Sequence, residues 1–195
     1  MREVELKAVL DSWENRRAKL MQAGASLVYA GRLEDRRYDT ADRALMARDI
    51  VLRLRIYRDE RNTRTELEYK GPTGYDRGYK VREEIGSTVS DPDAIALILS
   101  GLGYTVLRAI DREIEQFEIA NTVVRFERYP RMDELVEVEG EPESIERAIE
   151  LLGMPRVAFT AERLPDFAAR FEARTGSRAA LCDADLSAPS STRGS

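Results

Sequence analysis

Apolar and charged residues alternate along several short segments of this chain with a period of two. Such alternation is typical of β-strands that bury one face. In residues 1–10, for example, Glu3, Glu5 and Lys7 share one face and four aliphatic side chains share the other. The same pattern predicts strands at residues 50–57, 65–70, 80–85, 124–127 and 136–139, and less cleanly at 105–117.

Helical segments are marked by start and stop signals between these strands. Asp11 followed by Glu14 resembles a capping box, and this first helix is expected to end near Gly24. Proline starts and glycine stops predict three more helices, from Pro92 to Gly101 or Gly103, from Pro142 to Gly153 and from Pro165 to about Arg174. Together, strands and helices indicate an α+β protein.

A length of 195 residues fits one domain with a sizeable core. We expect this domain to cover residues 1–176, and residues 177–195, rich in small and polar residues, to form a disordered tail. The longest apolar run, Ala94 to Leu99, is too short to cross a membrane, and no signal segment opens the chain. With the single Cys182 excluding an intrachain disulfide, these features predict a cytoplasmic protein without a membrane partner.

The chain contains no histidine. Catalytic relays that need imidazole and histidine-ligated zinc sites are therefore excluded. Carboxylates, lysine, arginine, tyrosine, hydroxyl groups or metal ions must carry any chemistry. A formal net charge of −5 argues against a nucleic-acid partner, although a locally basic pocket could still bind phosphate. The composition leaves the oligomeric state open, with a homodimer as one alternative.

The charged strand faces are unusual because nearly every one combines glutamate with arginine or lysine. A single such face is normally solvated, and a structural β-sandwich with solvated charges is one interpretation. The acids on these faces are Glu3, Glu5, Glu66, Glu68, Glu84, Glu127, Glu137 and Glu139. The bases are Lys7, Arg53, Arg55, Lys70, Lys80, Arg82, Arg112 and Arg125. We expect these faces to line a closed antiparallel barrel covered outside by the helices, where the bases bind phosphate and the acids bind Mg²⁺ or Mn²⁺.

Six motifs in order resemble the CYTH family of triphosphate tunnel metalloenzymes. This family includes class IV adenylyl cyclases, thiamine triphosphatases and inorganic triphosphatases. The motifs are the ExExK of Glu3 to Lys7, Tyr38-Asp39-Thr40, Leu52-Arg53-Leu54-Arg55, Glu66 to Pro72, Arg82-Glu83-Glu84 and the closing ExE of Glu137 to Glu139. The resemblance covers residues 1–175.

The resemblance implies a closed barrel of eight antiparallel strands, a triphosphate tunnel, with helices packed outside. It also implies that Glu3, Glu5, Glu137 and Glu139 bind metal, and that Lys7, Arg53, Arg55, Lys70, Arg82 and Arg112 bind phosphates. The chain departs from the family at two positions. Ile110 stands where many members have lysine, which is missing or replaced by Arg108. Glu127 stands in place of an aspartate, so its role as a metal ligand depends on a longer side chain.

The leading hypothesis is a metal-dependent triphosphatase acting on a nucleoside, thiamine or inorganic triphosphate. The proton acceptor is Glu66, Glu68 or Lys70, and the sequence does not choose among them. Bacterial cyclases of the family often carry a His-Phe pair before ExExK, which this chain lacks. A class IV adenylyl cyclase is therefore the alternative, and a non-catalytic polyphosphate-binding or nucleotide-binding module is the second alternative. Arg36 and Arg37 are interpreted as a solvated pair.

Overall fold

The computed structural model describes residues 2–187. Nine strands form one antiparallel sheet in the described part of the chain. They are β1 (Arg2–Val9), β2 (Ser26–Thr40), β3 (Val51–Arg58), β4 (Thr63–Lys70), β5 (Gly74–Asp76), β6 (Tyr79–Val89), β7 (Tyr104–Ile119), β8 (Thr122–Arg128) and β9 (Leu135–Glu139).

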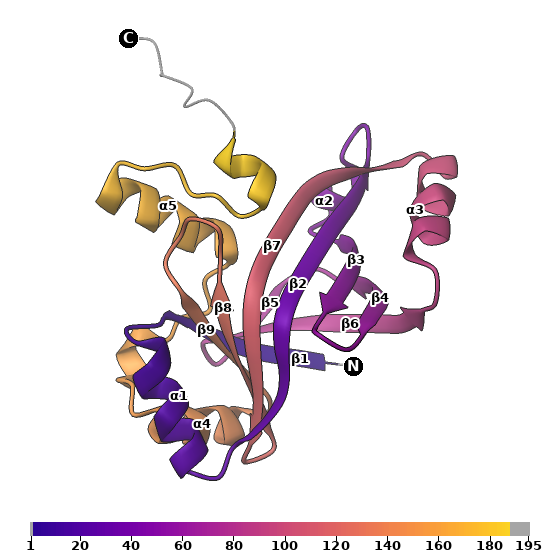
Figure 1. Cartoon of the computed structure of the whole chain (residues 1–195). Helices are drawn as coiled ribbons and strands as arrows, with labels where there is room; N and C mark the ends of the chain where they lie inside the picture. Colours follow the sequence, from indigo (N-terminus) through magenta and orange to yellow (C-terminus); the bar gives the residue numbers. More distant parts are fainter. Residues whose placement is uncertain (1, 188–195) are drawn as a thin grey trace.

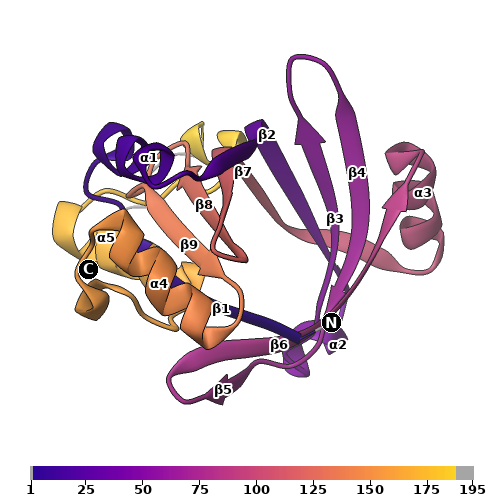
Figure 2. The ribbon, with the colours of Figure 1, turned by 90° about the horizontal axis from the view of Figure 1, so that it is seen from below.

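Eight of these strands close into a barrel. Their order is β1-β9-β8-β7-β2-β3-β4-β6, and pairing between β1 and β6 closes the ring. The short β5 adds a hairpin to β6. In Figure 2, β8 and β9 lie on one side and β3 and β4 on the other, with β1 and β6 joining the two sides. The predicted closed antiparallel barrel of eight strands is confirmed.

Helices cover the outside of the barrel (Figure 1). They are α1 (Trp13–Gln22), α2 (Ala44–Ala47), α3 (Pro92–Gly101), α4 (Pro142–Leu152) and α5 (Leu164–Thr175). The α1 and α4 helices pack together over the apolar faces of β1, β8 and β9, in the largest core cluster. The α3 helix buries Leu99 against outward side chains of β2 and β3. Among residues 2–187, no helix is both long enough and apolar enough to cross a membrane.

The helix boundaries agree with the start and stop signals except at the beginning of α1. Ser12, rather than Asp11, caps this helix, since the backbone N–H of Asn15 donates to Ser12 Oγ at 3.3 Å. Asp11 instead forms an ion pair with Arg16. Serine at this position satisfies one of the unpaired donors of the first helical turn, so the carboxylate is free to bind a neighbouring cation.

The strand β2 is the main element that the alternation pattern did not predict. It has 15 residues and pairs with β7 along almost its whole length. A close approach fixes one of its positions: a Cβ added to Gly31 would lie 2.5 Å from the carbonyl oxygen of Arg58. Only glycine therefore allows β2 to pass this close to the end of β3.

The first part of the segment expected as a tail is instead packed on the domain. Ala180 pairs with Arg131 in an isolated β-bridge and is fully buried. The backbone N–H of Asp111, in β7, donates to the carbonyl of Leu181 at 2.8 Å. A short 3₁₀ helix follows at Asp183–Leu186. Residues 188–195 of the expected tail lie outside the described residues.

Candidate active site

Closure of the barrel turns one face of every strand inward, and the inward residues line a pocket of about 490 Å³. All of the residues predicted to bind metal or phosphate line it. They are Glu3, Glu5, Lys7, Arg53, Arg55, Lys70, Lys80, Arg82, Arg112, Arg125, Glu127, Glu137 and Glu139. Most of the charged side chains on these strand faces therefore converge in one cavity, and the exceptions are Glu66 and Glu68.

Two of the three candidate proton acceptors lie outside this lining. Glu68 binds Arg53, whose Nε donates at 2.6 Å, and its carboxylate lies 3.4 Å from Arg55. Burial opposes the charge of Glu68, but attraction by Arg55 and Arg53 outweighs it and lowers its pKa to about 2. Glu66 forms an ion pair with Arg64 at 2.9 Å. Of the three candidates, only Lys70 lines the pocket.

Three glutamates from neighbouring strands form an acidic cluster in the pocket. Carboxylate oxygens of Glu3 in β1, Glu84 in β6 and Glu139 in β9 lie within 4.8 Å of one another. The Oε2 atom of Glu3 is buried and accepts no hydrogen bond. Burial raises the pKa of Glu139, and repulsion from Glu137 adds to this effect against the attraction of Arg125. Such crowded hard oxygen donors fit a divalent cation such as Mg²⁺ or Mn²⁺.

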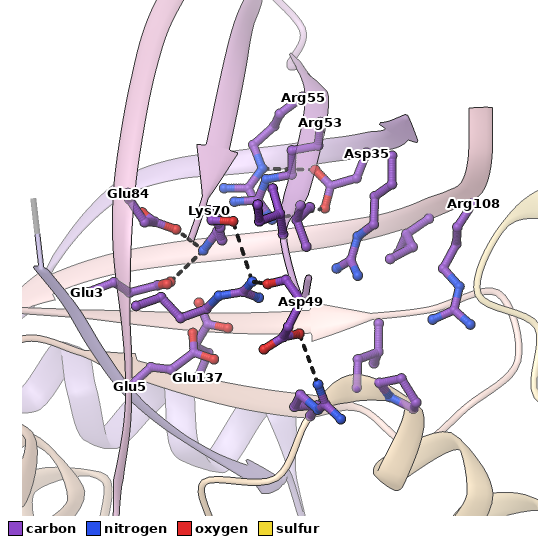
Figure 3. A pocket seen from close by; sticks show the side chains of 18 of the residues that line it. Glu3, Glu5, Asp35, Asp49, Arg53, Arg55, Lys70, Glu84, Arg108 and Glu137 are labelled. Carbon is purple, nitrogen blue, oxygen red and sulfur yellow. Dashed lines mark hydrogen bonds and ion pairs between the residues drawn. The ribbon is translucent and has the colours of Figure 1, made fainter. Parts of the chain in front are cut away.

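Lys70 lies directly beside the acidic cluster (Figure 3). Its Nζ is 2.7 Å from Glu3 Oε1 and also contacts Glu84. Burial and repulsion from Arg53 nevertheless lower the pKa of Lys70 to about 8. Lys70 is therefore paired with the acidic cluster on one side and repelled by Arg53 of β3.

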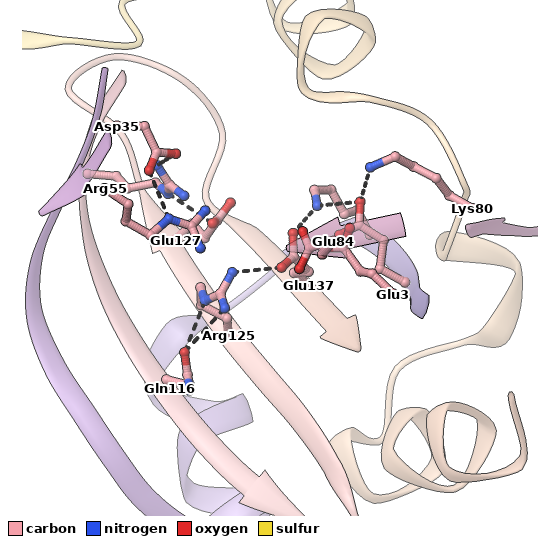
Figure 4. A network of polar contacts seen from close by, with 12 residues as sticks. Glu3, Asp35, Arg55, Lys80, Glu84, Gln116, Arg125, Glu127 and Glu137 are labelled. Carbon is pink, nitrogen blue, oxygen red and sulfur yellow. Dashed lines mark hydrogen bonds and ion pairs between the residues drawn. The ribbon is translucent and has the colours of Figure 1, made fainter. Parts of the chain in front are cut away.

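A second group of charges surrounds Glu5 and Glu137, and Figure 4 shows Glu137 with Arg125 beside it. Glu137 accepts from Arg125 Nη1 at 2.7 Å and contacts Lys7, whose Nζ also lies 3.0 Å from Glu5. Lys80 contacts the same carboxylate oxygen of Glu5 as Lys7 does. Burial opposes ionisation of Glu5, but Lys7 and Lys80 lower its pKa to about 2. Both glutamates are thus held as anions next to the acidic cluster.

Asp35, in β2, is surrounded by three arginines. Its carboxylate accepts from Arg55 Nε at 2.9 Å and Arg112 Nη1 at 3.1 Å, and lies 3.7 Å from Arg53 Nη1. The side chain is 1% exposed. Burial opposes its charge, but attraction by Arg55 and Arg112 holds the pKa of Asp35 well below its usual range. Asp35 therefore fixes the positions of the arginines that point into the pocket.

Glu127 and Arg82 have well-defined partners that bear on their predicted roles. Glu127 accepts from Arg112 Nε at 2.9 Å and from the hydroxyl of Tyr129 at 2.6 Å. Arg82 donates from Nε to the carbonyl of Gly71 at 2.6 Å and from Nη2 to the carbonyl of Asp49 at 2.5 Å. Glu127 thus orients Arg112, and Arg82 anchors the loop before β5 to the segment after α2.

The pocket has an exposed mouth and an apolar inner end. Its exposed lining residues come from the α2 region and the starts of β7 and α5, and they are Arg43, Met46, Leu107, Arg108, Arg163 and Pro165. At the inner end, Leu33, Tyr57 and Ile114 form a buried cluster. Each lies two positions along its strand from an inward residue, namely Asp35, Arg55 and Arg112, so each points into the lumen. The charged pocket is therefore bounded by packed apolar side chains on this side.

Asp35 and Arg37 line the pocket from β2. Sequence reasoning missed Asp35, wrongly interpreted Arg37 as part of a solvated pair, and counted Glu84 among the charged strand faces without naming it among the metal ligands that the family motifs imply. Glu84 shares a predicted face with Lys80, but its proximity to Glu139 arises only when β6 and β9 flank β1. For Asp35, the alternation of inward Asp35 and Arg37 was a usable signal. It was obscured because Glu34 and Arg36, on the outer face, are also charged.

The fold and the pocket define a charged tunnel inside a closed antiparallel barrel. The family model for the CYTH domain matches residues 1–152. The chain therefore belongs to the CYTH family, as the motifs in its sequence indicated. A search of curated proteins finds no match to the sequence.

Solved structures share this fold at low sequence identity. A candidate adenylate cyclase from Vibrio parahaemolyticus has a TM-score of 0.73 and 16% identity, covering 86% of this chain and 97% of that one. A protein from Pyrococcus horikoshii has a TM-score of 0.68 and 23% identity, covering 86% and 98%. A candidate adenylyl cyclase from Hippeastrum, described as having a dominant triphosphatase activity, has a TM-score of 0.61 and 16% identity, covering 92% and 98%.

Proposed function

We propose that this protein is a divalent-metal-dependent triphosphatase that hydrolyses an organic or inorganic triphosphate in its tunnel. The observation that carries the proposal is the meeting of an acidic cluster, Glu3, Glu84 and Glu139, with buried arginines in one pocket. Glutamate oxygens suit Mg²⁺ or Mn²⁺, whereas arginine forks suit phosphate oxygens. A site that binds phosphate alone would need only the arginine and lysine side chains and no acidic cluster.

The acidic cluster would hold the metal, with Glu5 and Glu137 next to it. The bound ion supplies Lewis-acid chemistry, which neutralises charge on the phosphate oxygens. Arg53, Arg55 and Arg112 are held by Asp35 and present their remaining N–H groups to the pocket. Preorganised donors of this kind stabilise the charge that develops during phosphoryl transfer without reorganising at the moment of reaction.

Lys70 is the candidate proton acceptor that the geometry favours, because it lines the pocket beside the acidic cluster. Glu68 instead acts as a positioning residue through its contacts with Arg53 and Arg55. Glu66 is paired with Arg64 outside the pocket lining, which makes it the weakest of the three candidates.

Class IV adenylyl cyclase activity is the second candidate, and it is supported by the structural neighbours described as candidate cyclases. The same lining could serve either reaction, because the two differ in which nucleophile attacks which phosphorus atom. Cyclisation requires the ribose 3′-hydroxyl at the α-phosphorus, and hydrolysis requires water at the terminal phosphorus.

A substrate panel separates these functions. The protein is incubated with ATP, thiamine triphosphate or tripolyphosphate, with Mg²⁺ or Mn²⁺ and with a chelator, and products are separated by ion-exchange chromatography. The proposal predicts metal-dependent release of orthophosphate. Cyclic AMP with pyrophosphate would establish the cyclase instead. Binding that survives chelation without turnover on any substrate would indicate a non-catalytic module.

A further inference from the structure

Two arginines in the pocket wall, Arg37 and Arg108, take no part in the ion-pair network described above. Arg37 lies in β2 two residues after Asp35, and Arg108 lies at the start of β7. Neither side chain forms an ion pair or hydrogen bond with any part of the chain that the structure describes, and the Nε atom of Arg37 is buried without a partner. Both line the pocket.

This isolation contrasts with the buried arginines of the tunnel, each of which has an ion-pair or hydrogen-bond partner. Arg53, Arg55 and Arg112 each contact Asp35, and Arg125 contacts Glu137. Arginine at a buried position is normally paired, because removing an unpaired charge from water is costly. An incoming anion should therefore gain more binding free energy at an unpaired arginine than at an arginine that is already paired with a carboxylate.

The surroundings of Arg37 are mainly cationic. Burial is the largest cause that lowers its pKa, and repulsion from Arg53, Arg108 and Arg112 adds to it against the attraction of Asp35, giving a value of about 10. The side chain thus keeps its positive charge at neutral pH. Its own electrostatic environment favours a further negative charge at this position.

The strand register places these cations in a row. Arg37 is directly opposite Arg108 on one neighbouring strand and opposite Arg53 on the other. Neighbouring strands are about 4.8 Å apart, so the row spans roughly 10 Å of the pocket wall. Figure 3 shows Arg108 on the side of the pocket away from Glu3 and Glu84. Arg108 is also exposed, which places this end of the row at the mouth.

We propose that Arg37 and Arg108 form an anion subsite between the triphosphate cradle and the mouth, which binds an additional phosphoryl group of a condensed inorganic phosphate longer than three units. This inference rests on the proposed function, since it assumes that the triphosphate part lies along Arg53 and the acidic cluster. A nucleoside or thiamine group attached to the triphosphate at this position would carry no negative charge to pair with the two arginines. The two guanidinium groups match phosphoryl oxygens in charge and in hydrogen-bonding geometry.

The test is a binding measurement that needs no turnover. Linear tetrapolyphosphate and tripolyphosphate are titrated into the full-length protein by isothermal calorimetry, in buffer with EDTA so that metal-dependent hydrolysis does not occur. We expect tetrapolyphosphate to bind at least about tenfold more tightly, as one or two additional charged hydrogen bonds imply. In Arg37→Gln and in Arg108→Gln, this preference should fall to about twofold or less.

A matched control removes a charge elsewhere. Arg147, on the outer helix α4, is exposed and makes no ion pair within residues 2–187, so Arg147→Gln should keep the full preference. Circular dichroism and thermal melting test whether the variants fold. Because Arg108 is exposed, Arg108→Gln still tests the proposal if Arg37→Gln does not fold.

Equal affinities of the wild-type protein for the two phosphates would overturn the subsite. So would a preference that survives both substitutions, or equal weakening of both ligands, which would indicate general electrostatic attraction.

Failure of the proposed function looks different. In that case, neither phosphate is hydrolysed when Mg²⁺ or Mn²⁺ is restored, while the preference for tetrapolyphosphate and its loss in the two variants persist. Conversely, if metal-dependent hydrolysis of tripolyphosphate occurs but the two ligands bind equally, only the subsite is contradicted.

Discussion

Asp35 shows how the charges inside the barrel depend on individual residues. It contacts three arginines that point into the pocket and is itself almost completely buried. Buried ion pairs gain little over apolar packing, but loss of one partner leaves the other charge uncompensated. A small change at Asp35 is therefore expected to affect the whole group.

Substitution Asp35→Asn should destabilise the protein by about 3–5 kcal/mol, because Arg55 and Arg112 lose a buried counter-charge. Urea denaturation followed by circular dichroism measures the change. Glu60, which is exposed, provides the control Glu60→Gln, for which we expect less than about 0.5 kcal/mol. Equal stabilities of Asp35→Asn and wild type would show that the arginines do not depend on Asp35.

Acid stability depends on carboxylates such as Glu68, whose pKa is lowered to about 2. A carboxylate with a lowered folded-state pKa stabilises the fold above its unfolded pKa, about 4.3, and this contribution is lost as the pH falls towards 2. The melting temperature of the wild type should therefore fall as the pH decreases from 4.5 to 2.5. Glu68→Gln should start lower at pH 7 and fall less over this window. Parallel pH profiles for the two proteins would contradict the role of this ion pair.

At the scale of elements, the strands with one charged and one apolar face could be predicted from sequence. The inner residues of β1 and β3 were assigned correctly because their outer residues are apolar and pack under helices or sheet neighbours. The strand β2 could not be predicted in this way. Its outer residues Glu34 and Arg36 form surface ion pairs, while Asp35 and Arg37 point inward, so charge no longer distinguishes the faces.

Contacts between strands were less predictable than the strands themselves. The ExExK motif indicated Glu3 as a metal ligand, but Glu84 joins it only through the pairing of β1 with β6. The interaction of Glu127 with Arg112 likewise depends on the register of β7 and β8. Sequence alternation gives the direction of a side chain, whereas its partners depend on the register of other strands.

The helix α5 packs on the barrel through the buried side chain of Phe167, beside the partly buried Leu164. Phe167 is 2% exposed and packs against Ile110, Tyr129 and Leu135. Phe167→Ala should cost about 3–5 kcal/mol in the free energy of unfolding, because it leaves a cavity in this cluster. Thermal or urea unfolding measures the loss, and Phe171→Ala, one turn later at a half-buried position, should cost clearly less. Equal effects of the two substitutions would show that α5 is not attached through Phe167.

For the molecule as a whole, the barrel brings opposite charges from strands far apart in sequence into one cavity. The acidic cluster lies on one side of this pocket, the Asp35-bound arginines lie next to it, and Arg108 lies at the mouth. Folding such a lining requires that nearly every buried charge has a partner, as the ion pairs show. Binding of a metal ion or a phosphate requires that some charged groups keep atoms without a hydrogen-bond partner. Glu3 Oε2 and Arg37 Nε are such atoms.

The most direct test of this account measures orthophosphate release from tripolyphosphate against Mg²⁺ or Mn²⁺ concentration. The account predicts turnover that a chelator abolishes, that added metal restores, and that falls by about a hundredfold or more in Glu139→Gln with the fold preserved. Glu60→Gln should retain wild-type turnover. Full activity of Glu139→Gln, or turnover unaffected by the chelator, would contradict the assignment of a metal-dependent site to this tunnel.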